Sequence, residues 1–446
     1  MAASPASLLT EGASGELAGP IVNRIGALDF VRGFALFGIL LMNITGFGLS
    51  NAYYNPLNNG GATGADLTAW RLIQVGFDGT QRAIFSILFG AGIVLLTRRL
   101  EKNVPTIASD IFMRRNLWLI GFGFFNAWAL IWDGDILYFY GITALFAYGF
   151  RNLAPRWLIG IGIFSLAVIA LYNLGVTRDN LAAYDAAQAA QAVEATGSTL
   201  SEEQETAIET WKGLEEEHTL SKDAIQQNIA AHQAGWRSTQ EANASFLEWF
   251  RTIYFYNHFG DVFGMMLIGM ALFKLGVLTL ERPASVYWAM VVVGYGIGIP
   301  LNLYETSWII ENDFSLISFN QTDITFDIGR LTVAMGHLGL LLLVYRSGLF
   351  DWFRRSMCAV GQMALTNYLS HSLVCAIIFV GFGLFGQLQR HQLYYIVGAI
   401  CVVQLIISPI WLKFFRFGPM EWVWRSLTYW KPQPFVRKTP ATANVH

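Results

Sequence analysis

Ionisable side chains interrupt several apolar stretches at spacings that place them on one face of a helix. The pairs are Asp29 with Arg32, Asp78 with Arg82, and His258 with Asp261. Residues three or four apart are neighbours on a helix surface. A carboxylate beside a guanidinium forms an ion pair, whereas a guanidinium that stays open on one side binds anions. An imidazole oriented by a carboxylate is suited to act as a general base.

Two later apolar stretches carry more polar residues. Arg330 and His337 are seven apart and share a helix face. Asn367 and His371 are one helical turn apart, in a stretch that also holds four other polar residues: Gln362, Thr366, Ser370 and Ser372. Such a density indicates either a face that lines a cavity or a set of hydrogen bonds between helices.

The composition is that of a membrane protein. The 446 residues are 54% hydrophobic and only 13% charged, against about 25% charged residues in soluble domains. The net charge of -2 leaves no basic field, which argues against nucleic-acid binding. We therefore predict an all-α, polytopic transmembrane bundle.

About 20 apolar residues are needed to cross the hydrocarbon core, and ten stretches approach that length. They are 26–49, 68–97, 112–132, 135–150, 156–175, 246–279, 284–304, 323–345, 357–383 and 392–412. Lys and Arg concentrate in alternate connections, such as 98–115 and 346–355. The positive-inside rule then places both termini in the cytoplasm.

These spans divide the chain into five parts. They are a disordered cytoplasmic tail over 1–25, a first transmembrane block over 26–176, an extracytoplasmic helical insert over 177–243, a second transmembrane block over 244–412, and a cytoplasmic interfacial helix with a tail over 413–446. Within the insert, Ser201 with Gln204 and Ser238 with Glu241 match the capping box that begins a helix. Two or three amphipathic helices are expected there.

The expected depth of a charged side chain in the bilayer indicates whether it can reach water or needs a partner within the protein. Arg82 lies near the centre of the second span, too deep to reach the membrane surface easily. We expect it to face protein, with Asp78 as its nearest partner, either in a structural pair or in a substrate site. Asp29 and Arg32 lie near the cytoplasmic mouth, where the alternatives are a helix anchor and an anion site.

Resident cofactors and metals are not indicated. The seven His residues contain no HExxH spacing, and the three Cys lie in apolar stretches without a Cys-x-x-Cys pair. The phosphate-binding patterns GxGxxG and GxxxxGK[ST] are absent from the sequence.

The segment 24–43, RIGALDFVRGFALFGILLMN, resembles the bacterial YeiB-like inner-membrane family, domain of unknown function 418. Four more segments agree with that family: FSILFGAG at 85–92, GDIL at 134–137, GQMALTNYLSHS at 361–372, and RFGPMEWVWRSLTY at 416–429. The resemblance covers both membrane blocks but not the insert. It implies a multi-pass protein of the bacterial inner membrane.

The resemblance also groups the chain with transmembrane acyltransferases, and so implies acyl transfer from cytoplasmic acyl-CoA, as a co-substrate, to an envelope glycan or lipid acceptor outside. The heparan acetyltransferase branch uses a histidine just after the first span, whereas 50–65 here contains none. If the chemistry persists, His371, or His258 with Asp261, would be the base. Arg32 and Arg82 would bind donor anions.

The residues expected at the site fall into two groups. Those expected in catalysis are His371, His258 and Asp261, and those expected to bind substrate or donor are Asp29, Arg32, Asn43, Asp78, Arg82, Arg330, His337 and Asn367. In the riskiest form of this prediction, one cavity connects His371 and Asn367 with Arg32 on one side and with Asp261 on the other. A transporter or flippase of an anionic or acylated molecule is the alternative, and a non-enzymatic membrane partner is the third interpretation.

Overall fold

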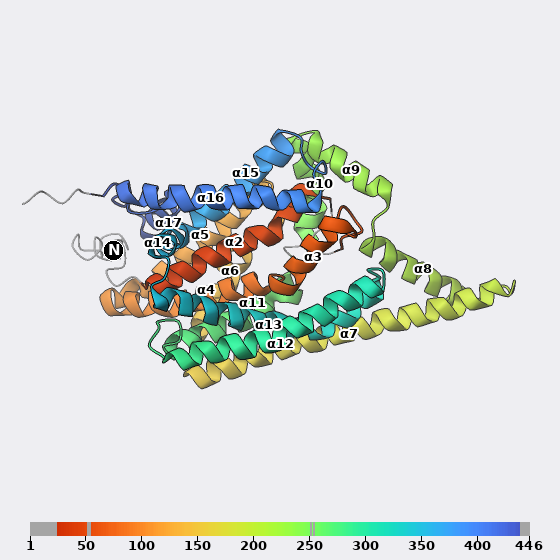
Figure 1. Ribbon diagram of the computed structural model, residues 1–446, viewed down its shortest axis with the longest axis horizontal. Helices are drawn as coiled ribbons and strands as arrows, with labels where there is room; N and C mark the ends of the chain where they lie inside the picture. The colour runs from red at the N-terminus through yellow and green to blue at the C-terminus, as the bar shows by residue number, and fades with distance from the viewer. Residues whose placement is uncertain (1–24, 51–54, 250–251, 253–254, 438–446) are drawn as a thin grey trace, which may run out of the picture.

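The computed structural model describes residues 25–50, 55–249, 252 and 255–437, and the described chain is helical throughout (Figure 1). The predicted tail over 1–25 and the last residues after 437 lie outside the described residues, apart from Ile25. An isolated bridge between Phe415 and Val436 is the single β-type pairing in the described part of the chain. The all-α prediction is therefore confirmed.

The membrane-type helices follow the predicted stretches. They are α2 (Gly26–Gly48), α3 (Gly64–Gly76), α4 (Thr80–Asn103), α5 (Ala108–Ala129), α6 (Leu137–Ala147), α7 (Pro155–Ala195), α11 (Phe255–Lys274), α12 (Ala284–Glu311), α13 (Leu316–Ser347), α14 (Asp351–Gln362), α15 (Ala364–Ala376) and α16 (Arg390–Phe414). Seven helical segments of the described chain are long and apolar enough to cross a membrane, counting α3 with α4 as one. The predicted count of ten spans is not confirmed.

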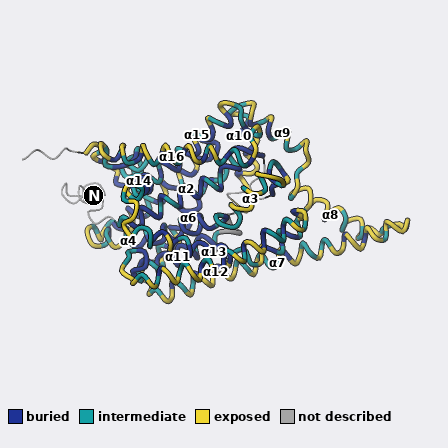
Figure 2. The backbone as a smooth tube through the Cα atoms, in the orientation of Figure 1, coloured by how far each residue is buried: buried dark blue, intermediate teal, exposed yellow. Residues whose placement is uncertain are grey.

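Helix α2 lies at the centre of the bundle. Its most apolar window is 78% buried, whereas that of α7 is 11% buried. In Figure 2 the outer surfaces of α7, α12 and α16 are largely exposed, and large apolar side chains such as Phe164, Val292 and Ile406 stand on them. An exposed apolar belt around a polar interior is the pattern of a bundle that faces lipid.

The second predicted span is broken. Between α3 and α4 the chain turns at Phe77–Gly79, and Gly79 adopts a φ of 63°. A side chain there would also collide with Arg330, whose Cδ lies 2.3 Å from the position of a Cβ. Glycine therefore meets two demands at the break, a left-handed backbone and a close approach. Asp78 lies in this turn and not in a continuous helix.

The insert forms three helices after α7, namely α8 (Glu202–His218), α9 (Lys222–Gln233) and α10 (Trp236–Trp249). Helix α7 continues to Ala195, so the expected boundary at 176–177 falls inside a helix. With α8 it forms a hairpin that projects beyond the bundle (Figure 1). The capping box of Ser201 and Gln204 is confirmed. That of Ser238 and Glu241 is wrong, because α10 begins at Trp236.

A C-terminal helix, α17 (Pro419–Tyr429), lies within the segment 413–446 where a helix was predicted, and it packs against α5 and α15. Glu421 on this helix accepts hydrogen bonds from the backbone amides of Leu365 and Thr366 and from the Thr366 hydroxyl. It therefore caps the first turn of α15, whose own N-cap residue supplies no side-chain hydrogen bond.

Glycines permit a close helix crossing between α4 and α11. A Cβ on Gly90 would lie 1.9 Å from the carbonyl oxygen of Met266, and one on Gly269 would lie 2.0 Å from that of Ile87. These neighbours are backbone atoms and cannot rotate away. Helices in lipid associate largely through such close contacts of small residues.

Replacing Gly90 by alanine is expected to destabilise the bundle by about 1–3 kcal/mol, as overpacking does. Gly92, two residues along the same helix, has nothing within 4 Å of a Cβ. Gly92→Ala is the matched control, and alanine's helix preference makes it neutral or slightly stabilising. Unfolding titrations in mixed micelles measure the difference. Equal stability of the two variants would contradict the close crossing.

Candidate functional site

A cavity of about 1080 Å³ lies at one end of the bundle, next to the insert. We call it the outer cavity. Many of its lining residues come from the end of α2 and the following Leu49, from the α3–α4 break, and from the facing ends of α11, α12 and α13. Others come from the α5–α6 connection, from α7 and from the insert. The opposite halves of α2, α11, α12 and α13 contribute none of the described lining residues. Of the residues predicted at the site, Asn43, Asp78, Arg82, Asp261 and Arg330 line this cavity.

An ion network forms the floor of the outer cavity and joins three helices. The guanidinium of Arg330 donates to both oxygens of Asp261, at 2.8 and 2.6 Å, and to Asp327 at 2.6 Å. Arg82 reaches the same Asp261 carboxylate at 3.2 Å. Arg330 and Asp261 are 2% and 3% exposed. Buried charges in a membrane protein persist when they are paired in this way.

This network confirms one prediction and corrects another. Arg82 faces protein and lines the outer cavity, as expected. Its ion pair is with Asp261 on α11, and not with Asp78 as predicted. The reason is the α3–α4 break, which removes the regular helical turn between Asp78 and Arg82.

The expected pairing of His258 with Asp261 cannot be followed, because the side chain of His258 lies outside the described residues. Asp261 itself receives hydrogen bonds from Arg330 and an ion pair from Arg82. A carboxylate whose oxygens are held by two guanidiniums is not available to orient an imidazole as the prediction required.

Three further carboxylates line the outer cavity: Asp78 from the break, Glu305 from α12 and Asp323 from α13. Asp323 lies close enough to the other two for their charges to repel. Glu305 accepts a hydrogen bond from Thr325. Glu305 and Asp323 were not predicted from the sequence, because they lie at the ends of the expected spans, where acidic residues are usually solvated. The available signal was that neither has a basic residue within four positions of it in the sequence.

The insert forms the roof of the outer cavity. Asn55 and Asn58 donate to the His218 carbonyl at 3.1 and 3.2 Å, and the His218 ring bonds to the Phe314 carbonyl at 3.0 Å. The His232 ring stacks on Phe385 with 3.9 Å between centroids. Burial lowers the pKa of both imidazoles, so both are neutral at pH 7. These two roof histidines were also missed from sequence.

Asn367 and His371 lie elsewhere, between α15 and α16. The Gln404 side-chain amide donates to the Asn367 carbonyl at 3.2 Å and to the Ser370 hydroxyl at 2.9 Å, which turns its oxygen toward His371 Nε2 at 3.0 Å. Asn367 also donates to Ser408 at 3.2 Å. The polar face of α15 therefore makes hydrogen bonds to a neighbouring helix. This was one of the two interpretations of its polar residues, the other being a face that lines a cavity.

The predicted single cavity is not observed, because neither Asn367 nor His371 is among the residues that line the outer cavity. His337 is also separate. Its two ring nitrogens contact the Tyr295 hydroxyl and the Gly76 carbonyl, each at 2.8 Å. Those contacts use both nitrogens, so His337 holds α3 and α12 together.

Asp29 and Arg32 lie at the opposite end of α2, 2.9 Å apart. Arg32 also contacts the Gly361 carbonyl at 3.4 Å, and its side chain stays 29% exposed. Arg115 lies close enough to Arg32 and Arg425 for their charges to repel, and its guanidinium stacks on Trp424 at 3.6 Å. We call Arg32, Arg115 and Arg425 the basic cluster. Its last two members were not predicted.

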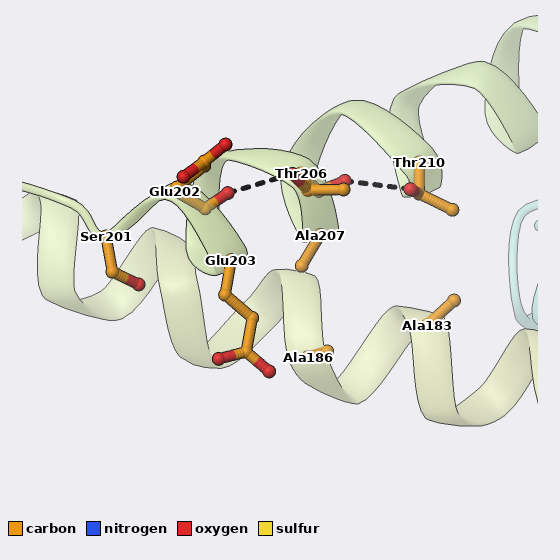
Figure 3. Close-up of a pocket in the computed structure, with 8 residues that line it drawn as sticks. All are labelled: Ala183, Ala186, Ser201, Glu202, Glu203, Thr206, Ala207 and Thr210. Carbon is orange, nitrogen blue, oxygen red and sulfur yellow. Dashed lines mark hydrogen bonds between the residues drawn. The ribbon is translucent and has the colours of Figure 1, made fainter.

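A second, shallow groove lies on the projecting hairpin of α7 and α8 (Figure 3). Ala183, Ala186 and Ala207 lie along the seam between the two helices. The hydroxyls of Thr206 and Thr210 are satisfied within α8, by the carbonyls of Glu202 and Thr206. The groove is the packing seam of the hairpin and offers no convergent polar groups.

The comparisons with known proteins agree with the sequence resemblance. Residues 272–431 match the family model described as "Protein of unknown function (DUF418)". The uncharacterized protein YxaH of Bacillus subtilis is 29% identical over 93% of this chain and 97% of its own length. The uncharacterized protein YeiB of Escherichia coli is also 29% identical, over 92% and 98%. No solved structure matches the chain.

Proposed function

We propose from its geometry that this chain, which resembles the YeiB-like membrane proteins of the DUF418 family, is acyltransferase-like. The names of the relatives give no activity. In this proposal the basic cluster holds the anionic part of a cytoplasmic acyl-CoA. The outer cavity holds an acceptor with a hydroxyl or amine, carried by an envelope glycan or lipid.

One observation supports the proposal most. Two polar sites of different character lie at opposite ends of the same central helix. Arg32 of the basic cluster and Asn43 of the outer cavity are eleven residues apart on α2, which is about 16 Å along a helix axis. An extended thioester arm anchored by phosphates at one end can bridge such a distance. A protein that served one side of the membrane would need only one of these sites.

His371 is the candidate base in this proposal. Since the Gln404 oxygen can only accept a hydrogen bond, His371 Nε2 carries the proton, and Nδ1 is left able to take one. Nδ1 would take the acceptor's proton while the nucleophile bonds to the thioester carbonyl. The thiolate would then leave and be protonated. Helix α15 packs against α2, the helix that joins the two sites. His371 does not line the outer cavity, so this role requires the acceptor to reach from the cavity to α15.

The experiment places purified protein in liposomes with acetyl-CoA on the Arg32 side and a bacterial envelope extract on the other. We expect thiol release that requires both the extract and the protein. Arg32→Gln should raise the acetyl-CoA concentration needed for half-maximal release. Its control is Arg237→Gln, a 91% exposed arginine of the insert. Thiol release that ignores the extract would reject acyl transfer.

Transport is the second candidate, and the α3–α4 break favours it. Discontinuous helices that meet at a charged cavity are common in secondary transporters. The outer cavity, lined from one side only, then corresponds to one of two alternating states. Accumulation of an extract component inside the liposomes, without thiol release, would support this candidate over acyl transfer.

The orientation is part of the proposal. Arg98 and Arg99 lie near the end of α4, and Arg114 and Arg115 lie near the start of α5, on the side of the basic cluster. The positive-inside rule therefore supports a cytoplasmic location for this end. The insert and the outer cavity are then extracytoplasmic, in a bacterial inner membrane. Membrane lipids are the expected surroundings of the exposed apolar belt.

A further inference from the structure

The walls of the outer cavity are strongly biased toward negative charge. Seven carboxylates line it, against two guanidiniums. Both guanidiniums are already paired with Asp261, and Arg330 is also paired with Asp327. The cavity thus has no spare positive charge for an anionic substrate among its described lining residues. This differs from the anion-binding role that the sequence suggested for Arg82.

Asp78, Glu305 and Asp323 form a separate wall, which we call the acidic wall. Within the described chain none of the three is in salt-bridge contact with a basic side chain, although Arg82 and Arg330 lie close enough to Asp78 to attract its charge. Asp78 and Glu305 are each 7% exposed, whereas Asp323 is open to the cavity. Carboxylates that repel one another in a low-dielectric setting require a counter-charge or protons. Three different helical segments converge here, so the wall results from the fold.

A neighbouring side chain gives a second and independent indication. Gln81 also lines the outer cavity, is 1% exposed, and its Oε1 has no hydrogen-bond partner in the described structure. Its Nε2 donates to the Thr80 hydroxyl at 3.3 Å. A buried amide oxygen without a donor costs free energy. The terminal torsion of Gln is soft, so a donor in the cavity can draw this oxygen toward it.

A ligand that satisfies both features carries positive charge and several N–H donors. A primary ammonium has three donors and a unit charge. A metal ion fits less well, because no group of three metal-binding side chains exists in the part of the chain that the structure describes. Phe77 and Phe326 also line the cavity beside Asp78 and Asp327, and aromatic faces attract cations.

We propose that the outer cavity recognises a primary amine, with the acidic wall supplying the charge and Gln81 accepting one N–H bond. The inference deepens the proposed function, on which it rests for the role of the cavity. The amine belongs either to a free small molecule or to a lipid headgroup.

Binding to the full-length protein in phosphatidylcholine nanodiscs tests this without any acyl donor. The probes are ethanolamine and its neutral analogue ethylene glycol, with affinity taken from ligand-induced thermal stabilisation. We expect ethanolamine to bind at least about tenfold more tightly, as one charge-assisted hydrogen bond allows. Equal affinity, or preference for an anionic probe such as acetate, would overturn the proposal.

Variants locate the site. Asp323→Asn is expected to weaken ethanolamine binding about tenfold, and its exposed side chain makes misfolding an unlikely cause. Gln81→Met should weaken it less. Glu217→Gln, a cavity carboxylate contributed by the insert, is the matched control and should bind as the wild type does. Loss in the control but not in Asp323→Asn would place the amine elsewhere and reject the acidic wall.

Nanodiscs with phosphatidylethanolamine separate the two sources of the amine. Competition by this lipid against ethanolamine identifies a headgroup ligand, and lack of competition identifies a free small molecule. Both outcomes are consistent with recognition of a primary amine by the outer cavity. Amine binding without thiol release in the liposome assay would reject acyl transfer and leave this inference standing.

Discussion

Replacing His371 by alanine is expected to reduce acyl transfer about 10²–10⁴-fold, the usual contribution of a general base. The expectation follows from the tautomer that Gln404 fixes, which leaves Nδ1 free to accept a proton. Thiol release from acetyl-CoA in the liposome assay measures the effect. A variant that retains wild-type turnover would remove His371 from the mechanism.

Two variants separate catalysis from folding. His371→Asn keeps a hydrogen-bond donor for Gln404 and should fold, yet it should lose transfer as alanine does. His337→Gln is the control in another span, because both nitrogens of that imidazole already have structural partners. Gln404→Leu should change the pH profile of the reaction as well as its rate, because the proton of the His371 ring is then no longer held on Nε2.

Asp261→Asn is expected to destabilise the bundle by about 3–5 kcal/mol, because it leaves the buried Arg330 and the half-buried Arg82 without the counter-charge they share. Arg330 donates two hydrogen bonds to this carboxylate and is almost fully buried. A mixed-micelle unfolding titration gives the difference in unfolding free energy. Wild-type stability in Asp261→Asn would mean that the network does not hold α4, α11 and α13 together.

The double variant Arg82→Gln with Asp261→Asn restores the net charge of the floor and should recover part of the loss. Glu241→Gln is the matched control, because its partner Arg237 and the carboxylate itself are 91% and 69% exposed. Surface pairs of this kind contribute about 0–1 kcal/mol. The difference between the losses of unfolding free energy in Asp261→Asn and in Glu241→Gln measures the effect of burying a paired carboxylate.

Apolar length and local spacing predicted most of the fold. The helices α2 and α16 begin and end within two residues of the expected positions, because each is a single apolar run. Helix α12 ends seven residues later than expected and α13 begins seven residues earlier. The local pair of Asp29 and Arg32 is confirmed, since both partners lie on one helix. The break between α3 and α4 was not predicted, because a glycine at one position does not reveal a left-handed turn by composition alone.

The site was predicted less well because its contacts join distant segments. Asp261, Arg82 and Arg330 were each singled out, but their mutual pairing depends on how three helices pack. His371 was expected at one shared cavity mainly because of the density of polar residues in its span, and that density does not determine which neighbour a helix face meets. Its partner Gln404 lies 33 residues away on α16.

The central position of α2 also means that some of its contacts can form only late in synthesis. Arg32 contacts the carbonyl of Gly361, 329 residues later in the chain. At synthesis rates of roughly 5–20 residues per second, about 15–70 s separate the appearance of the two partners. During that interval the first helix resides in the bilayer without α14, α15 and α16, which later pack against it. The ion pair of Asp29 and Arg32 lies within one helical turn, so it can form as soon as α2 folds. Asp29 can therefore neutralise the charge of Arg32 until the later helices are made.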